Sequence, residues 1–278
     1  VYCLDAKTGA EIWKAKVGSR AKNSSFVVVG GVAVIPVGPL TGFDPENGKV
    51  LWKQDKIGYG NSSPAYWRKD GKTYLVCNVR NKVSCVDPKT GDILWSVRGG
   101  GDATPAIVGD YMAVATNKKD ASIIAYKLSK TKAEKLWSIE KFLDRGASSV
   151  IHDGFVYVMG KSGAWCVSLQ TGEVAWQKKL GNPEYSSPIV ADGKLFVAGA
   201  RGALMMVEAT PDECKVLGKA KASMASCTSI AFADGKLFFR TRDGIACYEL
   251  AKKAKKRLIP SFNRFFYGDQ PHLHDRPP

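Results

Sequence analysis

Several residue types and patterns are scarce or missing in this sequence, and each absence removes a class of protein. There are three histidines in 278 residues, and the seven cysteines form neither an adjacent pair nor a Cys-x-x-Cys spacing, which argues against a structural zinc site. No apolar run approaches the roughly 20 residues of a membrane-spanning helix. The 28 glycines follow no collagen-like period, and no helical periodicity is sustained. What remains is a globular composition, 45% hydrophobic and 24% charged, with enough apolar surface for a real core.

Carboxylates are also scarce relative to cations. The chain has 26 Asp+Glu against 41 Lys+Arg, which gives a formal charge of +15. Residues 251–278 hold seven of the cations and two of the anions, so residues 1–250 keep a charge of +10. A basic surface attracts anionic partners such as nucleic acid, lipopolysaccharide or acidic protein faces, and the alternative is a solvated surface that confers solubility. The sequence starts at Val1 inside a repeat, without Met or a signal-peptide pattern, so we expect a processed or truncated piece.

A repeat of about 40 residues runs along the chain. Five segments align, with two weaker copies at 204–218 and 245–258: VYCLDAKTGAEIW (1–13), LTGFDPENGKVLW (40–52), VSCVDPKTGDILW (83–95), IIAYKLSKTKAEKLW (123–137) and AWCVSLQTGEVAW (164–176). We use the residue two before the acidic position as a marker of register. The markers are spaced by 39, 43, 40, 41, 40 and 41 residues: Cys3, Gly42, Cys85, Ala125, Cys166, Met206 and Cys247. This regularity is typical of a repeat architecture.

Each unit predicts four short strands. In 62–98 these are SSPAYW, KTYLVCNV, KVSCVD and DILWSV, which are rich in β-branched and aromatic residues and separated by turns with Gly, Asp or Asn. Four-stranded units at this period indicate an all-β propeller of antiparallel blades. We expect about seven blades over residues 1–250, the first of them incomplete, or eight if the chain is truncated at its N-terminus. Residues 251–278 break the pattern, and we expect a basic, proline- and aromatic-containing tail that is poorly ordered.

The repeated motif has a turn and an indole. The Asp that opens Asp-x-x-Thr-Gly can accept hydrogen bonds from backbone N–H groups two or three residues later, and the glycine tolerates positive φ. A tryptophan follows on the fourth strand, where the flat indole can lie against the next blade and bury roughly 200 Å². We therefore expect five indoles to dock neighbouring blades: Trp13, Trp52, Trp95, Trp137 and Trp176.

These residues resemble the tryptophan-docking motif of the pyrroloquinoline-quinone-type (PQQ-like) β-propeller family, over residues 1 to about 250. The motif is specific for the propeller class and not for an activity. One branch comprises quinoprotein alcohol dehydrogenases. The other comprises non-catalytic propellers, which include the propeller lipoprotein of the outer-membrane β-barrel assembly machinery. The resemblance implies a periplasmic or cell-envelope location.

The sequence departs from the catalytic branch. Those dehydrogenases carry a disulfide between adjacent cysteines, a catalytic Asp and a Ca²⁺ site, and this chain has no adjacent cysteines and no clustered oxygen ligands outside its structural turns. We therefore predict a non-enzymatic, monomeric scaffold that binds no cofactor, metal or nucleic acid. A quinone-dependent dehydrogenase and a sensor or ligand-binding ectodomain are the alternatives, and membrane association through an upstream anchor stays open.

A ring of cations is the candidate binding site. Four of them stand five residues before a marker, Lys118 lies close to the corresponding place in the fourth unit, and all five fall in the turn between second and third strands: Arg80, Lys118, Lys161, Arg201 and Arg242. The loops that lead into the next blade share that face and carry Tyr59, Asn61, Asp102, Arg145 and Tyr185. We predict that this rim binds a protein, an acidic peptide, a carboxylate or a glycan. The alternative is a set of solvated turn residues.

The remaining reactive side chains predict no active site. Cys3, Cys85, Cys166 and Cys247 occupy the marker position, which other units fill with Gly, Ala or Met, so we expect buried, free thiols that act as small hydrophobes. His272 and His274 are close in sequence, and we expect no physiological metal there.

Overall fold

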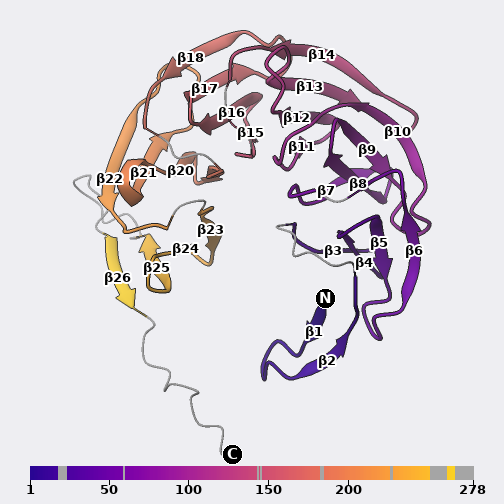
Figure 1. Ribbon diagram of the computed structural model, residues 1–278. Coiled ribbons are helices and arrows are strands. Elements are labelled where there is room, and N and C mark those ends of the chain that lie inside the picture. Colours follow the sequence, from indigo (N-terminus) through magenta and orange to yellow (C-terminus); the bar gives the residue numbers. More distant parts are fainter. Residues whose placement is uncertain are drawn as a thin grey trace, which may run out of the picture.

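The computed structural model describes residues 1–17, 24–58, 60–142, 144, 146–181, 185–225 and 228–250, and the backbone of 262–266. It confirms the predicted all-β propeller. Seven antiparallel sheets follow one another in chain order around a central axis. The first and the last sheet stand apart, so the ring is open between them (Figure 1). Within this described part, the one helical element is a 3-10 turn, η1 (Ala200–Gly202). No described helix is long and apolar enough to cross a membrane.

We number the sheets as blades 1 to 7. Blade 1 has two strands, β1 (Tyr2–Leu4) and β2 (Glu11–Lys14). Blade 2 consists of β3 (Val27–Val29), β4 (Val32–Pro36), β5 (Leu40–Phe43) and β6 (Val50–Gln54). Blade 3 consists of β7 (Ala65–Lys69), β8 (Lys72–Val79), β9 (Lys82–Val86) and β10 (Ile93–Arg98). Blade 4 consists of β11 (Ala106–Val108), β12 (Tyr111–Ala115), β13 (Ile123–Leu128) and β14 (Ala133–Ile139).

The other three blades repeat this order. Blade 5 consists of β15 (Val150–His152), β16 (Phe155–Gly160), β17 (Gly163–Ser168) and β18 (Val174–Lys178). Blade 6 consists of β19 (Ile189–Ala191), β20 (Lys194–Ala198), β21 (Ala203–Glu208) and β22 (Val216–Lys221). Blade 7 consists of β23 (Ala231–Ala233), β24 (Lys236–Arg240), β25 (Ile245–Leu250) and β26 (Phe262–Phe266). Strand β26 comes from the segment 251–278 that the sequence pattern assigned to a tail. The rest of that segment, His272 and His274 included, lies outside the described residues.

Turn chemistry sets the spacing of the strands. Asp-Gly pairs with positive φ at both residues join first and second strands in four blades, for example Asp153 (45°) and Gly154 (78°). Such turns match the twist of a hairpin. In the repeated motif, Asp5 Oδ1 accepts the backbone N–H of Thr8 at 2.7 Å, and the Thr8 hydroxyl donates to the same oxygen. These hydrogen bonds hold the pKa of Asp5 below its usual value.

The marker residue and the indole of each motif are cross-strand neighbours. Cys85 pairs with Trp95, Ala125 with Trp137 and Cys166 with Trp176. In blade 2 a Cβ on Gly42 would lie 2.3 Å from Cε2 of Trp52. The marker is therefore small because its own blade's tryptophan lies over it. Blade 6 reverses the volumes, since Met206 pairs with Gly218.

Each indole also contacts the following blade. The five Nε1–H groups donate to a backbone carbonyl in the next motif, one or two residues after the acidic position. The acceptors are Pro45 for Trp13 (2.8 Å), Pro88 for Trp52 (3.0 Å), Ser129 for Trp95 (2.9 Å), Leu169 for Trp137 (2.9 Å) and Thr210 for Trp176 (2.8 Å). The indoles thus join consecutive blades from the outer strand, by packing and by a directed hydrogen bond.

Candidate functional site

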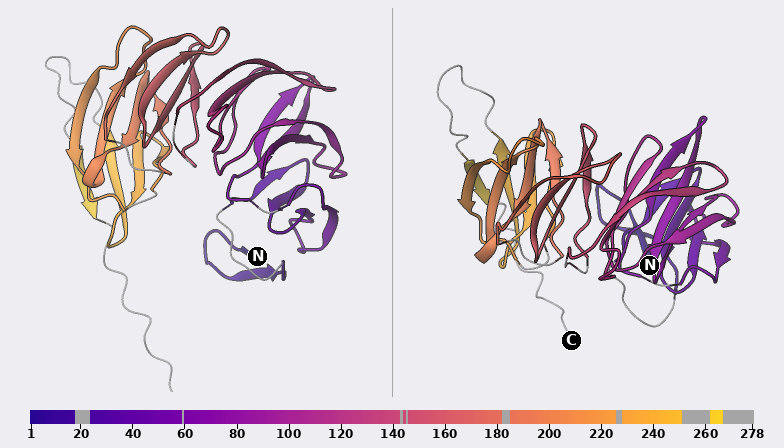
Figure 2. Two further views of the ribbon diagram at one scale, coloured as in Figure 1. Left: turned by 45° about the horizontal axis from the view of Figure 1, so that its top comes forward. Right: turned by 90° about the horizontal axis from the view of Figure 1, so that it is seen from above.

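The antiparallel order of the blades sorts their connections onto two faces. First-to-second and third-to-fourth turns lie at one end of every sheet, and second-to-third turns lie at the other end with the loops that lead into the next blade. A view from the side shows these two faces of the ring (Figure 2). We call the second-to-third turns and the incoming loops, together with the terminal residue of each strand beside them, the rim face. The first-to-second and third-to-fourth turns, with the terminal strand residues beside them, form the opposite face.

The five predicted cations lie on the second-to-third turns of five consecutive blades. Arg80 belongs to blade 3, Lys118 to blade 4 and Lys161 to blade 5, and Arg201 and Arg242 follow on blades 6 and 7. Lys118 is half-buried and the other four are exposed. Of the residues predicted on the incoming loops, Tyr59 and Arg145 lie outside the described residues.

Two of these cations meet glycines of incoming loops. A Cβ on Gly58 would lie 2.7 Å from Nη2 of Arg80, so the guanidinium packs directly on the loop that enters blade 3. A Cβ on Gly100 would lie 3.1 Å from the Arg80 carbonyl oxygen and 3.3 Å from Cε of Lys118. Gly100 therefore brings the turns of blades 3 and 4 into one local cluster.

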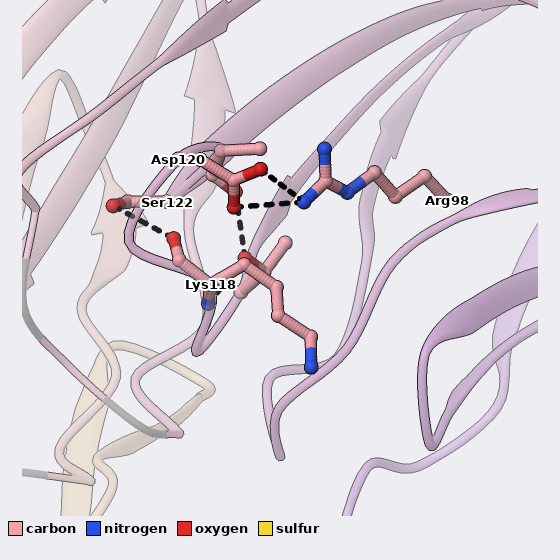
Figure 3. A network of polar contacts seen from close by, with 6 residues as sticks. Arg98, Lys118, Asp120 and Ser122 are labelled. Atoms are coloured by element: carbon pink, nitrogen blue, oxygen red, sulfur yellow. Dashed lines mark hydrogen bonds and ion pairs between the residues drawn. The ribbon is translucent and has the colours of Figure 1, made fainter.

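A polar network holds the Lys118 turn in place (Figure 3). Nη2 of Arg98, at the end of β10, donates to both carboxylate oxygens of Asp120 at 2.7 and 2.6 Å. This hydrogen bond lowers the pKa of the Asp120 carboxyl. Within the turn, Thr116 Oγ1 accepts the Lys118 N–H at 3.0 Å, and Ser122 Oγ donates to the Lys118 carbonyl at 3.1 Å. The lysine backbone is thus fixed on the rim face.

Two buried polar side chains position the incoming loops. Asn78 Nδ2 donates to the carbonyls of Gly100 and Ala103 at 3.0 and 2.8 Å, and Oδ1 accepts the Gly100 N–H at 2.9 Å. Asp144 accepts N–H groups from Gly146 and Ala147 through Oδ1 and from Lys161 through Oδ2. These two residues carry no recognisable signal in the sequence. The partners of Asn78 are 22 to 25 residues away, and neither residue type recurs at its position in the repeat.

Other predicted loop residues contact one another across neighbouring blades. Asn61 Nδ2 donates to Asp102 Oδ1 at 3.1 Å, which joins the loops that enter blades 3 and 4. A Cβ on Gly146 would lie 2.6 Å from Cδ1 of Tyr185 and 3.2 Å from Cβ of Asp102. Gly146 therefore has no room for a side chain, and it lets the loops of blades 4, 5 and 6 touch.

A chain of hydroxyl groups runs through these loops, and it too was missed. Just before the innermost strands of blades 2 to 6, a backbone N–H donates to the Oγ of the equivalent Ser or Thr in the next blade, over five steps: Ser25 to Ser63, Ser63 to Thr104, Thr104 to Ser148, Ser148 to Ser187, and Ser187 to Ser229. The recurring Ser-Ser dipeptides were the available signal. The sequence pattern predicts a strand that includes Ser62–Pro64, but β7 begins at Ala65. Ser62–Pro64 instead belong to the incoming loop, where Ser63 links neighbouring blades.

The two faces carry unequal charge. Among the described residues, the rim face has 16 cations: Lys14, Lys16, Lys56, Arg80, Lys82, Arg98, Lys118, Lys119, Lys141, Lys161, Lys178, Lys179, Arg201, Lys221, Arg240 and Arg242. Its six described carboxylates are Asp55, Asp102, Asp120, Glu140, Asp144 and Asp243. The described opposite face has 15 carboxylates and ten lysines. The rim face is therefore the cationic side of the molecule.

The cysteines do not form a reactive centre. All six that the structure describes are free, and Cys77, Cys85, Cys166 and Cys214 are buried. Burial raises the pKa of Cys77 and Cys85 to about 12 and that of Cys166 to about 11. These thiols stay protonated at neutral pH, and thiolate is the nucleophilic form.

We expect native Cys77, Cys85 and Cys166 to resist iodoacetamide at pH 8, where their thiolate fraction is about a thousandth or less. Mass spectrometry of tryptic peptides after a short labelling pulse would show unmodified thiols, and unfolding in urea would make the same three react. Labelling of any of them at the rate of a free thiol in the native protein would contradict this burial.

A metal-dependent site does not assemble in the part of the chain that the structure describes. Within it, no three side chains of His, Cys, Asp or Glu come close enough to hold a metal ion. The buried carboxylate of Asp144 is already used by three backbone N–H groups. These residues do not fit the Ca²⁺ that a quinoprotein dehydrogenase requires, and we derive no chemistry through such a group.

Comparison with known proteins agrees with this architecture. The sequence matches the family described as outer membrane protein assembly factor BamB over residues 1–63 and 37–257. It is 25% identical to BamB of Xanthomonas campestris pv. campestris over 196 residues, and 23% identical to tetrathionate hydrolase of Acidithiobacillus ferrooxidans over 237 residues. These alignments cover 65% and 74% of the chain but 47% of each relative, so the chain spans about half the length of the curated relatives.

The fold comparison agrees with the propeller architecture. The crystal structure of BamB from Moraxella catarrhalis superposes with a TM-score of 0.72 and 17% identity, over 88% of this chain and 76% of that one. The family match covers nearly the whole sequence and includes the five docking tryptophans. The chain therefore belongs to the PQQ-like propeller family of outer membrane protein assembly factor BamB.

Proposed function

We propose that this chain is a non-catalytic scaffold that binds an acidic segment of a protein partner through its rim face, in the cell envelope. The observation that carries the proposal is the row of cations on the second-to-third turns of blades 3 to 7. The propeller holds these turns rigidly, because Asn78, Asp144 and the chain of hydroxyl groups fix the neighbouring loops. Rigid presentation lowers the entropic cost of binding. The names of the BamB relatives, assembly factors of the outer membrane, favour a protein partner and an extracytoplasmic location.

Charge reversal on the rim tests this proposal. We expect Arg201→Glu with Arg242→Glu to weaken binding of a fluorescein-labelled peptide of ten glutamates by about tenfold or more at low salt, since opposed charges become like charges. Fluorescence anisotropy at 50 mM NaCl would measure the affinity. The matched control, Lys7→Glu with Lys49→Glu, makes the same change of charge with exposed residues of the opposite face. Equal loss in both variants, or none in the first, would contradict a rim site.

An enzyme is the second candidate, because one relative is a tetrathionate hydrolase. Thiosulfate production from tetrathionate by the purified chain would favour it over a scaffold. The dehydrogenase and the sensor ectodomain have less support, since the described residues assemble no metal site and the family match is to an assembly factor.

A further inference from the structure

The two faces of the propeller differ in net charge. The rim face carries 16 described cations against six carboxylates, and the opposite face carries ten against 15. The opposite face also neutralises several of its own lysines in ion pairs, such as Lys69–Asp110, Lys130–Asp70 and Lys215–Glu208. The excess of positive charge therefore lies on one side of the ring.

Half of the rim carboxylates make polar contacts within the chain. Asp144 is buried and accepts three backbone N–H groups, Asp120 is held by Arg98, and Asp102 accepts the Asn61 amide. These three carboxylates order turns and loops of this face, and Asp120 stays exposed beside Arg98. What an approaching surface meets is dominated by ammonium and guanidinium groups.

The cations are spread over every blade. Exposed examples are Lys16 after blade 1, Lys56 after blade 2, Lys119 in blade 4, Lys161 in blade 5, Lys179 after blade 5 and Arg242 in blade 7. A short acidic peptide can reach the cations of one or two neighbouring blades at once. A flat anionic surface can reach all of them together, because the turns and loops that carry them lie at the same end of every sheet (Figure 2).

We propose that the rim face docks on the anionic headgroups of a lipid bilayer, with the axis of the propeller upright on the membrane. This inference goes beyond the proposed protein partner, which would contact the same face. The binding is electrostatic, since lysines and arginines near an anionic surface are each attracted to it within a Debye length of about 10 Å at 0.1 M salt.

Vesicle sedimentation with the full chain tests this inference. The probe is vesicles with 30% phosphatidylglycerol in phosphatidylcholine, compared with phosphatidylcholine alone. We expect binding to the anionic vesicles at 50 mM NaCl that falls about tenfold or more at 500 mM. A rim variant, with Lys56, Lys119, Lys179 and Arg242 changed to Glu, should lose about tenfold or more of its partition. The control variant changes Lys7, Lys49, Lys72 and Lys89 of the opposite face to Glu and should keep more than half.

Both variants share one net charge and one basic segment 251–278, so a difference between them reports on the faces. Equal loss in the two variants, or binding that is the same to neutral vesicles, would overturn the inference. Tighter binding of soluble polyglutamate than of anionic vesicles at equal anion concentration would also overturn it and assign the face to acidic proteins. Failure with vesicles leaves the rim peptide experiment unaffected, because that experiment contains no lipid.

Discussion

Replacement of Trp137 by alanine is expected to destabilise the protein by about 3–5 kcal/mol, the range for loss of a buried aromatic side chain. The indole is 9% exposed, packs in the core cluster between blades 4 and 5, and donates from Nε1 to the Leu169 carbonyl at 2.9 Å. Its removal leaves a cavity between two blades and an unpaired carbonyl. Urea unfolding followed by circular dichroism would measure the change, provided that the slope with denaturant stays constant.

Two companion variants separate the causes. Trp137→Phe keeps an aromatic ring but loses the hydrogen bond, so we expect an intermediate loss of about 1–3 kcal/mol. Val174→Ala removes an exposed apolar side chain from the outer strand of blade 5, and we expect a change within about 0.5 kcal/mol. If Trp137→Ala were as mild as Val174→Ala, the indoles would not be what holds the blades together.

The fold was predictable because each blade repeats the same local sequence signals. Asp-Gly turns, alternating strands and the motif spacing determine a hairpin meander without reference to distant residues, and the strands expected in blade 3 end within three residues of those observed. The marker position was correctly predicted to prefer small or apolar side chains. The register adds the reason, which is the indole lying over it, and explains why Met206 can replace a small marker where Gly218 replaces the tryptophan.

The rim was only partly predictable. Sequence spacing identified the turn that carries the cations, because that turn recurs at a fixed distance from the marker. It could not show that Gly100 joins Arg80 to Lys118, or that Asn78 and Asp144 order the loops, since these contacts join loops of different length and occur once each. Strand β26 was missed for a related reason: the 11 residues between β25 and β26 hide the period, although Phe265 stands opposite the marker Cys247, where other blades have tryptophan.

The glycine of the motif has a second role that the sequence did not reveal. At Gly91 φ is +79°, as the turn requires, but a Cβ there would also lie 2.5 Å from Cε3 of Trp52 in the preceding blade. Gly9 occupies the same motif position with φ of +73° and has no atom within 4 Å of such a Cβ. The two glycines therefore form a natural matched pair, with equal backbone demands and different neighbours.

We expect Gly9→Ala to cost about 1 kcal/mol, the strain of a left-handed residue with a Cβ. Gly91→Ala should cost about 2–4 kcal/mol, since overpacking of the docked indole adds to the same strain. Urea unfolding of the two single variants would measure the difference. Equal costs would mean that the glycine serves the turn alone.

A double-mutant cycle assigns the excess to one contact. In a Trp52→Ala background the indole is gone, so Gly91→Ala should lose its overpacking term and cost about 1 kcal/mol, as Gly9→Ala does. The coupling energy between positions 52 and 91 then measures how closely one blade fits the turn of the next. This glycine has no room for a side chain because the tryptophan of the preceding blade packs on it. The same residue therefore serves both the turn and the docking of blades. The same relation holds at Gly48 with Trp13 and at Gly172 with Trp137, so the cycle tests how this ring is assembled.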